Sequence, residues 1–526
     1  MEARDNQERV TPEVRIRDVV MIFAAITVLH ISILQRYPII YGGDTIIRLV
    51  NFPKILIGYQ LPLFQVLLHY TMLAFYHPLA VWILMALVSA AGASGLYGLT
   101  LQLSGDRRAA WLAVVLYATH PFIVLYSRVP YQEPLLWAGL VWGFCYLFRP
   151  PSARNLVLSS VWIGIACLTR YEGWIGAAAA AAYHLWRTPE IGGKLRLRHL
   201  VQSAMLFGWA PLLWLAWNRG VSPGGTYVLD WGSEWARLYR PYFVVKSALW
   251  WTDSAVILMS LLGLALTWAH ARTPKQNQSH ATLAFFTVLF LGALIFSAHG
   301  IKPDPLRFVT EREAYVPIAL LILYAGVGGS RLAGELPRML ARAPLLSNGL
   351  LLLALLLIAA LGLNRGIHRV AAANEDPEVK TSFEVAQFLA RKQTPALILA
   401  RPLPEDQLLF HLGRAERSGG ARGKEMAIRM LRETETTPFD YQRILAFSWM
   451  GREKILSADR LKDLEASFCE KFVRDRQIEY LVIFDDFVPA QNHERLLSSY
   501  AERRHPEIEI RNGNKGARIY RLSTEH

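Results

Sequence analysis

Cysteine is scarce in this 526-residue chain, which holds only Cys145, Cys167 and Cys469. Two of them fall within apolar runs and the third stands alone, so their spacing supports neither a disulfide framework nor a zinc site. The glycine fingerprint of a dinucleotide-binding fold is also missing, as is any basic and aromatic module for nucleic acid. These absences exclude disulfide-rich scaffolds, Rossmann-type nucleotide enzymes and nucleic-acid binders.

Long apolar runs are what the chain does have. Hydrophobic residues make up 53% of it, and up to residue 363 they fall in runs of about 16 to 22, enough to cross a hydrocarbon core of ~30 Å. The pattern predicts a polytopic α-helical membrane domain over 1–363, with about eleven spans, and a small C-terminal α/β soluble domain over 364–526. The candidate spans are 19–35, 79–101, 109–126, 133–148, 155–169, 172–186, 200–217, 254–270, 281–298, 314–329 and 346–363.

The positive charge is concentrated in the membrane part. Residues 364–526 carry 27 Lys and Arg against 25 Asp and Glu, so +12 of the net +14 lies before them. With a cytoplasmic N-terminus, the loops on that side carry 17 Lys and Arg against 12 on the other side. This agrees with the positive-inside rule. It predicts an outward, extracytoplasmic face that collects residues 36–78, 127–132, 299–313 and the whole C-terminal part.

The C-terminal part alternates helical and strand-like segments. "TSFEVAQFLARK" and "ADRLKDLEASFCEKFVRDRQ" have helical periodicity, whereas "PALILA" and "EYLVIF" are short apolar strands. "EIEIRNGNKGARIYRL" alternates around an Asn-Gly pair, which predicts a terminal β-hairpin.

The first outward segment contains "YGGDTIIRLVN", in which Asp44, Arg48 and Asn51 are spaced to share one face of a helix. The segment is amphipathic and too interrupted to span, which favours a helix lying in the membrane interface. A simpler interpretation is that Asp44 caps a helix and Arg48 lies on its solvated face.

Three further outward loops place charges at the ends of apolar runs. "SRVPYQEP" contributes Arg128 and Glu133, and "LTRYEGW" contributes Arg170 and Glu172. The third loop, "KPDPLRFVTEREAYVP", holds Lys302, Arg307 and Arg312 with Asp304, Glu311 and Glu313. Each loop also has an ordinary interpretation. Glu133 could lie in a first helical turn, Arg170 and Glu172 could form a local ion pair, and the third loop could be a solvated charged loop.

The joint placement of these charges is more informative than any one motif. Ionisable groups at membrane depth are costly and point to function. Cations that hold a phosphate, together with a carboxylate that accepts a proton, suit group transfer from a phosphate-bearing lipid.

These residues resemble the GT-C superfamily of membrane glycosyltransferases, and within it the protein O-mannosyltransferase and aminoarabinose-transferase branch. The similar elements are "GGDTIIRLVN" followed by "GYQLPLFQVLLH", Arg-x4-Glu-Pro from Arg128, Arg-x-Glu-Gly from Arg170, and "REAYVP" before a late span. Many relatives have Asp-Glu in the first loop, whereas Thr45 follows Asp44 here. The oligosaccharyltransferase signature Trp-Trp-Asp-Tyr-Gly is absent.

The resemblance implies an inverting transferase that moves a sugar from a polyprenyl-phosphate donor to a protein, lipid or glycan acceptor outside the cytoplasm. It implies no required cofactor, although a divalent metal is compatible with it. A short cytoplasmic N-terminus and the lack of a retention signal fit a bacterial inner membrane. Asp44 and Glu133 would be the catalytic carboxylates, with Asp44 as the general base or the group that orients the acceptor, and Glu133 as the second carboxylate of the cleft. The candidates for binding the phosphate or the rest of the substrate are Arg48, Arg128, Arg170, Glu172, Lys302, Arg307 and Arg312.

Two other classes stay open from the residues alone. A transporter or lipid flippase would place ionisable residues near the middle of spans and carry paired broken helices. A non-catalytic anchor that presents the C-terminal domain would not need carboxylates in four membrane loops.

Asp44 is expected to be the residue most sensitive to substitution. If its carboxylate takes the acceptor proton, Asp44→Asn should lower turnover by about 10²- to 10⁴-fold with the fold intact. A capping Asp would tolerate Asn, which caps equally well. Turnover measured at equal folded amounts separates the two roles, and near-wild-type activity would reject the base.

Overall fold

The computed structural model describes residues 14–37, 61–75, 78–187, 193–221, 234–269, 274–296, 312–339, 344–392, 396–399, 480–485 and 505–522. The chain divides into two compact units, which are described separately. The first comprises Met1–Tyr37, Ile55–Thr71 and Leu79–Val370, and the second comprises Pro38–Lys54, Met72–Pro78 and Ala371–His526.

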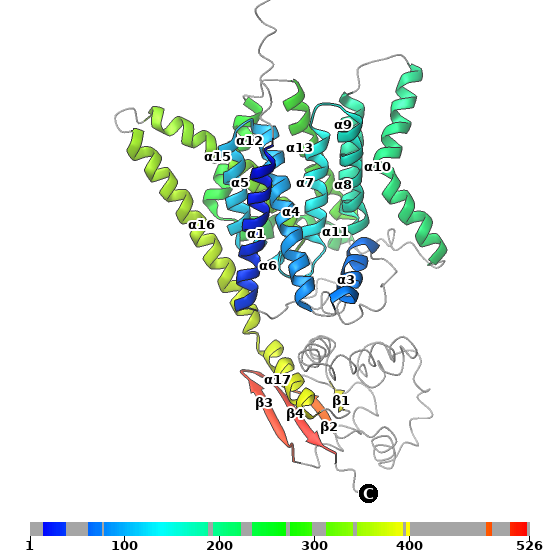
Figure 1. Cartoon of the computed structure of the whole chain (residues 1–526), viewed down its shortest axis with the longest axis vertical. Helices are drawn as coiled ribbons and strands as arrows, with labels where there is room; N and C mark the ends of the chain where they lie inside the picture. The colour runs from blue at the N-terminus through cyan, green and yellow to red at the C-terminus, as the bar shows by residue number, and fades with distance from the viewer. Residues whose placement is uncertain are drawn as a thin grey trace, which may run out of the picture. The chain divides into compact units, whose positions relative to one another are not determined.

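The described part of the first unit is helical, and its central helices lie side by side and mostly antiparallel (Figure 1). A short 3-10 turn, η2, immediately precedes α15. The elements are α1 (Ile16–Arg36), α3 (Pro62–Phe75), α4 (Pro78–Ser104), α5 (Arg107–Thr119), α6 (Pro121–Tyr126), α7 (Glu133–Leu147), α8 (Ala153–Thr169), α9 (Glu172–Arg187), α10 (Gly193–Val221), α11 (Glu234–Trp251), α12 (Ser254–Ala269), α13 (Pro274–Phe296), η2 (Arg312–Ala314), α15 (Tyr315–Met339) and α16 (Pro344–Asn374).

Polar caps and prolines set where several helices begin. The Asp106 carboxylate accepts a hydrogen bond from the backbone N–H of Arg108 (2.8 Å) at the start of α5, and Ser152 caps α8 in the same way. These caps satisfy N–H groups that a first helical turn leaves without partners. Pro121 and Pro134 lie in the first turns of α6 and α7, where the missing N–H costs nothing.

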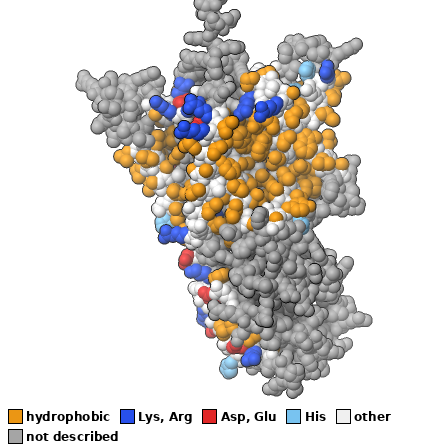
Figure 2. All heavy atoms as spheres, viewed as in Figure 1, with side chains coloured by type: hydrophobic (Ala, Val, Ile, Leu, Met, Phe, Trp, Pro, Cys, Tyr) orange, Lys and Arg blue, Asp and Glu red, His pale blue; other side chains and the backbone are white. Residues whose placement is uncertain are grey.

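Large apolar side chains cover much of the outside of this unit, as the orange band in Figure 2 shows. Leu258 on α12 and Leu353 on α16 are more than half exposed, which suits contact with lipid tails. Within the described residues, five helices are long and apolar enough to cross a membrane, or six if a pair bent by 113° counts as one span. The chain is therefore an integral membrane protein. The five are Ile16–Arg36, Ala80–Ser104, Leu197–Ala216, Arg312–Ala333 and Leu353–Ala373, and the bent pair is Tyr242–Trp251 with Ser254–Thr267.

The predicted spans coincide with helices, with one exception: 109–126 forms two helices, α5 and α6, because the backbone turns at His120 before Pro121. Helix α11 lies between the predicted spans 200–217 and 254–270, where the sequence analysis expects no helix. Helix α16 runs through residue 363, where the membrane domain was expected to end. The number of eleven spans and the division at 363 stay predictions, since no membrane boundary is defined.

The second unit contains a four-stranded sheet whose order is β1-β2-β4-β3 (Figure 1). β1 (Ala396–Leu399) runs parallel to β2 (Tyr480–Phe484), whereas β4 (Lys515–Arg521) is antiparallel to both β2 and β3 (Ile508–Asn512). Helix α17 (Pro377–Lys392) packs on β3 and β4. The predicted helix, strands and terminal hairpin are thus confirmed, while the predicted helix at 458–477 lies outside the described residues.

Two glycines bring α12 and α15 into backbone contact. A β-carbon at Gly263 would overlap the carbonyl oxygen of Tyr324, and one at Gly328 would overlap that of Met259. Small residues let membrane helices approach this closely and gain dispersion contacts.

Replacing Gly328 by Leu should therefore separate α12 from α15 and destabilise the protein by about 1–3 kcal/mol or more. Gly292→Leu in α13 is the matched control, because a β-carbon there meets no atom within 4 Å. Thermal unfolding of both variants in detergent measures the difference. Equal melting temperatures would contradict this account of the α12–α15 contact.

Candidate functional site

Charged side chains from four elements meet at one end of the helical unit. Glu133 is the first residue of α7 and Glu172 the first of α9, while Arg170 follows the last residue of α8. Arg312 and Glu313 form η2, directly before α15. We call these five residues the charged cluster.

The connection between α8 and α9 is only two residues long, and it holds Arg170 in place. The backbone N–H of Arg170 donates to Ala166 O (3.1 Å), and that of Gly173 donates to Arg170 O (2.9 Å). A β-carbon at Gly173 would overlap the carbonyl of Ala166. The glycine of "TRYEG" is therefore required for this tight turn.

Arg170 is surrounded by carboxylates. Its Nε and Nη2 donate to the two oxygens of Glu172 (3.0 and 2.6 Å), a bidentate pair of the kind that guanidinium geometry favours. Nη1 donates to Glu133, and Nη2 lies 3.8 Å from Glu313 Oε1. Only 12% of the Arg170 side chain is exposed, so one largely buried cation joins the starts of α7 and α9 to η2.

Glu133 lies between two guanidinium groups. Besides Arg170, it has Arg312 beside it, with Nε 3.3 Å from Glu133 Oε1, and the Arg312 guanidinium also lies over the ring of Tyr131 (5.2 Å). Glu133 is 1% exposed, and its second oxygen, Oε2, has no hydrogen-bond partner within the described part of the chain. The carboxylate is thus held firmly through Oε1, whereas Oε2 is buried without a partner among the described residues.

Arg128, in the connection between α6 and α7, has different surroundings. It is 8% exposed, and Nη2 donates to Tyr37 O (3.2 Å) at the end of α1, whereas Nε and Nη1 find no partner among the described residues. Burial lowers the pKa of its guanidinium to about 10, so it still carries its charge at neutral pH. A buried cation with two unused donors is a strong candidate for binding an anion.

Hydroxyl groups fix the backbone next to Arg128. Ser127 Oγ and Tyr315 OH are 2.7 Å apart, and Tyr315 OH is 2.6 Å from Tyr117 OH. These buried contacts tie the α6–α7 connection to α5 and to α15, and α15 directly follows the two η2 residues of the charged cluster.

The structure brings together four of the predicted site residues: Glu133, Arg170, Glu172 and Arg312. Arg128 lies in the connection that leads into Glu133. The sequence pattern presents Glu313 only as one of three acidic residues in a charged loop and not as a site candidate. Its position directly before an apolar run, like that of Glu133, was the signal that could have singled it out. Asp44, Arg48, Lys302 and Arg307 lie outside the described residues.

Metal binding has no support within the described residues, where no group of three or more His, Cys, Asp or Glu side chains is placed to hold an ion. Three carboxylates do surround Arg170, but its guanidinium occupies the space between them.

The fold is that of the GT-C membrane glycosyltransferases, which confirms the resemblance read from the sequence. The chain is similar to ArnT from Cupriavidus metallidurans bound to undecaprenyl phosphate, with a TM-score of 0.55, 13% identity and coverage of 96% of this chain and 98% of that one. Apo ArnT from the same organism has a TM-score of 0.54 at 14% identity, with the same coverage. The apo oligosaccharyltransferase of Archaeoglobus fulgidus has a TM-score of 0.48 at 11% identity, and the match covers 88% of this chain and 69% of that one. By sequence, no family model and no curated protein matches.

Removing the cation of the charged cluster should destabilise the fold. Arg170→Gln would leave buried carboxylates without their partner, at a cost of about 3–5 kcal/mol. Arg365→Gln is the control: Arg365 also pairs with a carboxylate, Asp253, but is 53% exposed, and exposed pairs contribute about 0–1 kcal/mol. Thermal unfolding in detergent compares them. A melting temperature for Arg170→Gln as high as that of Arg365→Gln would show that the cluster does not hold the bundle together.

Proposed function

We propose that this protein is an inverting glycosyltransferase that moves a hexose or pentose from a polyprenyl-phosphate donor to an acceptor outside the cytoplasm. The observation that carries the proposal is a GT-C fold, matched over nearly the whole length of ArnT. One end of the helical unit in this chain gathers buried arginines and glutamates. That ArnT structure holds undecaprenyl phosphate, so a lipid-phosphate sugar donor is the substrate class that the fold favours.

Arg128 is the side chain best suited to hold the donor phosphate. Arg170 already has Glu172, Glu133 and Glu313 beside it, so a phosphate would have to compete with carboxylates for its donors. Arg128 has unused donors instead, and a phosphate there would give partners to two buried nitrogens that lack a hydrogen bond. Phosphate binding by Arg170, Lys302, Arg307 and Arg312 remains part of the proposal as supporting positive charge.

In the proposed reaction, an acceptor hydroxyl attacks the anomeric carbon as the bond from that carbon to the phosphate oxygen breaks. The electron pair of that bond leaves with the polyprenyl phosphate, whose growing negative charge is stabilised by Arg128. The acceptor proton passes to the carboxylate of Asp44. Glu133, held by two arginines, offers Oε2 as a hydrogen-bond acceptor that orients a substrate hydroxyl. One displacement gives inversion at the anomeric carbon.

Incubating the purified protein in lipid nanodiscs with a panel of polyprenyl-phosphate pentoses and hexoses tests the reaction itself. A transferase releases free polyprenyl phosphate only when an acceptor is present, and mass spectrometry detects it. Movement of intact donor between leaflets, with no release from any panel member, would instead favour a lipid flippase and overturn the proposal.

Arg128→Gln should weaken binding of undecaprenyl phosphate by about 10- to 100-fold, because a hydrogen bond to a charged group contributes about 1.5–3 kcal/mol. The affinity of Arg128→Lys for undecaprenyl phosphate should lie between those of the wild type and Arg128→Gln, since lysine keeps the charge and loses the planar guanidinium.

Arg36→Gln provides a matched control, because Arg36 ends α1 next to Tyr37, whose carbonyl Arg128 contacts, yet is exposed. Its affinity for undecaprenyl phosphate, measured by microscale thermophoresis, should change less than about threefold. The assignment of Arg128 fails if both Gln variants bind as tightly as the wild type.

A further inference from the structure

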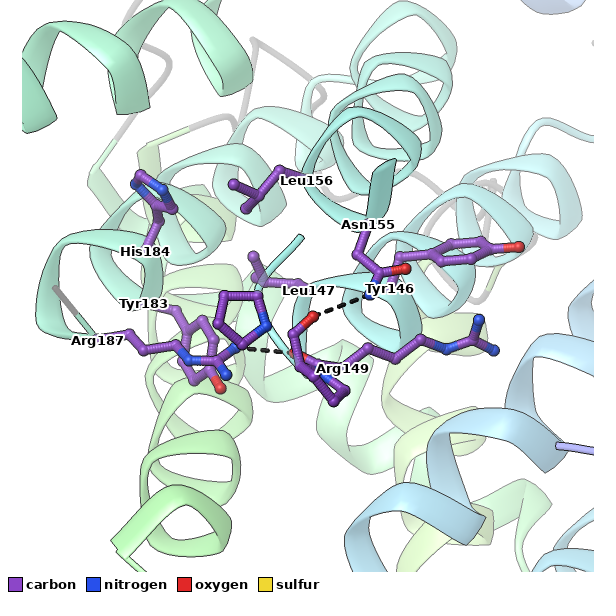
Figure 3. Close-up of a pocket in the computed structure, with 10 residues that line it drawn as sticks. Tyr146, Leu147, Arg149, Asn155, Leu156, Tyr183, His184 and Arg187 are labelled. Atoms are coloured by element: carbon purple, nitrogen blue, oxygen red, sulfur yellow. Dashed lines mark hydrogen bonds between the residues drawn. The ribbon is translucent and has the colours of Figure 1, made fainter. Parts of the chain in front are cut away.

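A pocket of about 200 Å³ lies between α7, α8 and α9, at the opposite end of these helices from the charged cluster (Figure 3). The antiparallel order of the helices places it there. Glu133 begins α7 and Arg149 follows its end, while Glu172 begins α9 and Arg187 ends it. The pocket is therefore separate from the site proposed for sugar transfer.

The pocket is mostly apolar, but its charged groups are of one sign. Leu156 and the buried ring of Tyr183 contribute to its wall, together with Pro150. Arg149 and Arg187 are the charged residues of the lining, which contains no Asp or Glu. Across the described residues, neither arginine forms an ion pair with a carboxylate. No carboxylate of the described part of the chain therefore neutralises their charge.

Neutral groups hold both arginines in place. Arg187 Nη1 donates to the backbone carbonyl of Arg149 (2.9 Å), so its side chain reaches across the pocket, as Figure 3 shows. The Arg149 guanidinium lies over the ring of Tyr146, 4.6 Å from the centroid. Such contacts fix the direction of a guanidinium without cancelling its charge, which preorganises it for an anion.

The surroundings of the pocket are those of a membrane surface. Trp186, next to Arg187, is 57% exposed, and tryptophan is enriched at the level of lipid headgroups. Helix α10 packs beside α8 and α9 and exposes Leu200 and Val201. Lys and Arg side chains also gather along one edge of the apolar band in Figure 2.

We propose that this pocket binds the phosphate of an anionic glycerophospholipid. Arg187 donates to the phosphate oxygens, Arg149 adds positive charge at the rim, and an acyl chain lies along the apolar surface of α8, α9 and α10. Basic pockets between membrane helices bind phosphate headgroups for this reason, since the cations meet the phosphate at the depth where the tails reach apolar side chains.

The test compares ligands on the purified full chain in a neutral detergent, using phosphatidylglycerol, phosphatidylcholine and inorganic phosphate. Native mass spectrometry counts retained lipids, and thermal unfolding reports stabilisation; neither depends on transferase activity. Wild-type protein should retain phosphatidylglycerol in preference to phosphatidylcholine. The Arg149→Gln/Arg187→Gln double variant should lose that preference, and its affinity for phosphatidylglycerol should fall by about tenfold or more.

The matched control is Arg107→Gln/Arg108→Gln, which removes the same charge from the start of α5, outside the pocket. This variant should keep the wild-type preference. An equal loss in both double variants would show a general attraction of the basic surface and overturn the site. Equal stabilisation by inorganic phosphate would overturn the lipid assignment. If the pocket double variant does not fold, the single variant Arg187→Gln carries the same expectation, and unchanged lipid retention by it would reject the proposal.

Discussion

The buried Arg170 guanidinium is the group on which the arrangement of the charged end depends. It binds Glu172 across a two-residue turn, reaches Glu133 at the start of α7, and lies near Glu313 before α15. Three segments far apart in the sequence therefore meet around one cation. Because buried charges are costly to desolvate, these contacts must form together for any of them to be favourable. The cluster thus ties the connections between helices to a single geometry.

Much of the helical architecture was predictable from the sequence, because apolar runs of membrane length form helices whatever their tertiary partners. Pro121 and Pro134 mark the starts of α6 and α7, yet the continuous apolar run over 109–126 predicts a single helix and hides the break at His120. Helix α11 was missed for another reason. Arg237, Arg240, Pro241 and Lys246 interrupt its apolar pattern, so nothing local distinguished a helix from a loop.

The grouping of the charges was predictable, whereas their pairing was not. Alternate connections of a helical bundle share an end, so Glu133 and Arg170 could be placed near each other by counting spans. Whether Arg170 would meet carboxylates or remain open to a phosphate depends on side-chain reach, which a sequence does not record. Arg128 illustrates the same limit: its unused donors follow from its burial beside Tyr37. Asp44, Arg48, Lys302 and Arg307 lie outside the described residues, so their part in the site stays a prediction.

The glycine contact between α12 and α15 fixes how far each helix is shifted along its axis relative to the other. Backbones that touch at Gly263 and Gly328 interlock, so the two helices cannot slide past each other without a clash. A slip of one residue would move α15 along its axis by about 1.5 Å. Since Glu313 lies 3.8 Å from Arg170, a shift of that size would change the distance between their charged groups. Two residues without side chains, several turns away, thereby set the depth at which Glu313, just before α15, meets Arg170.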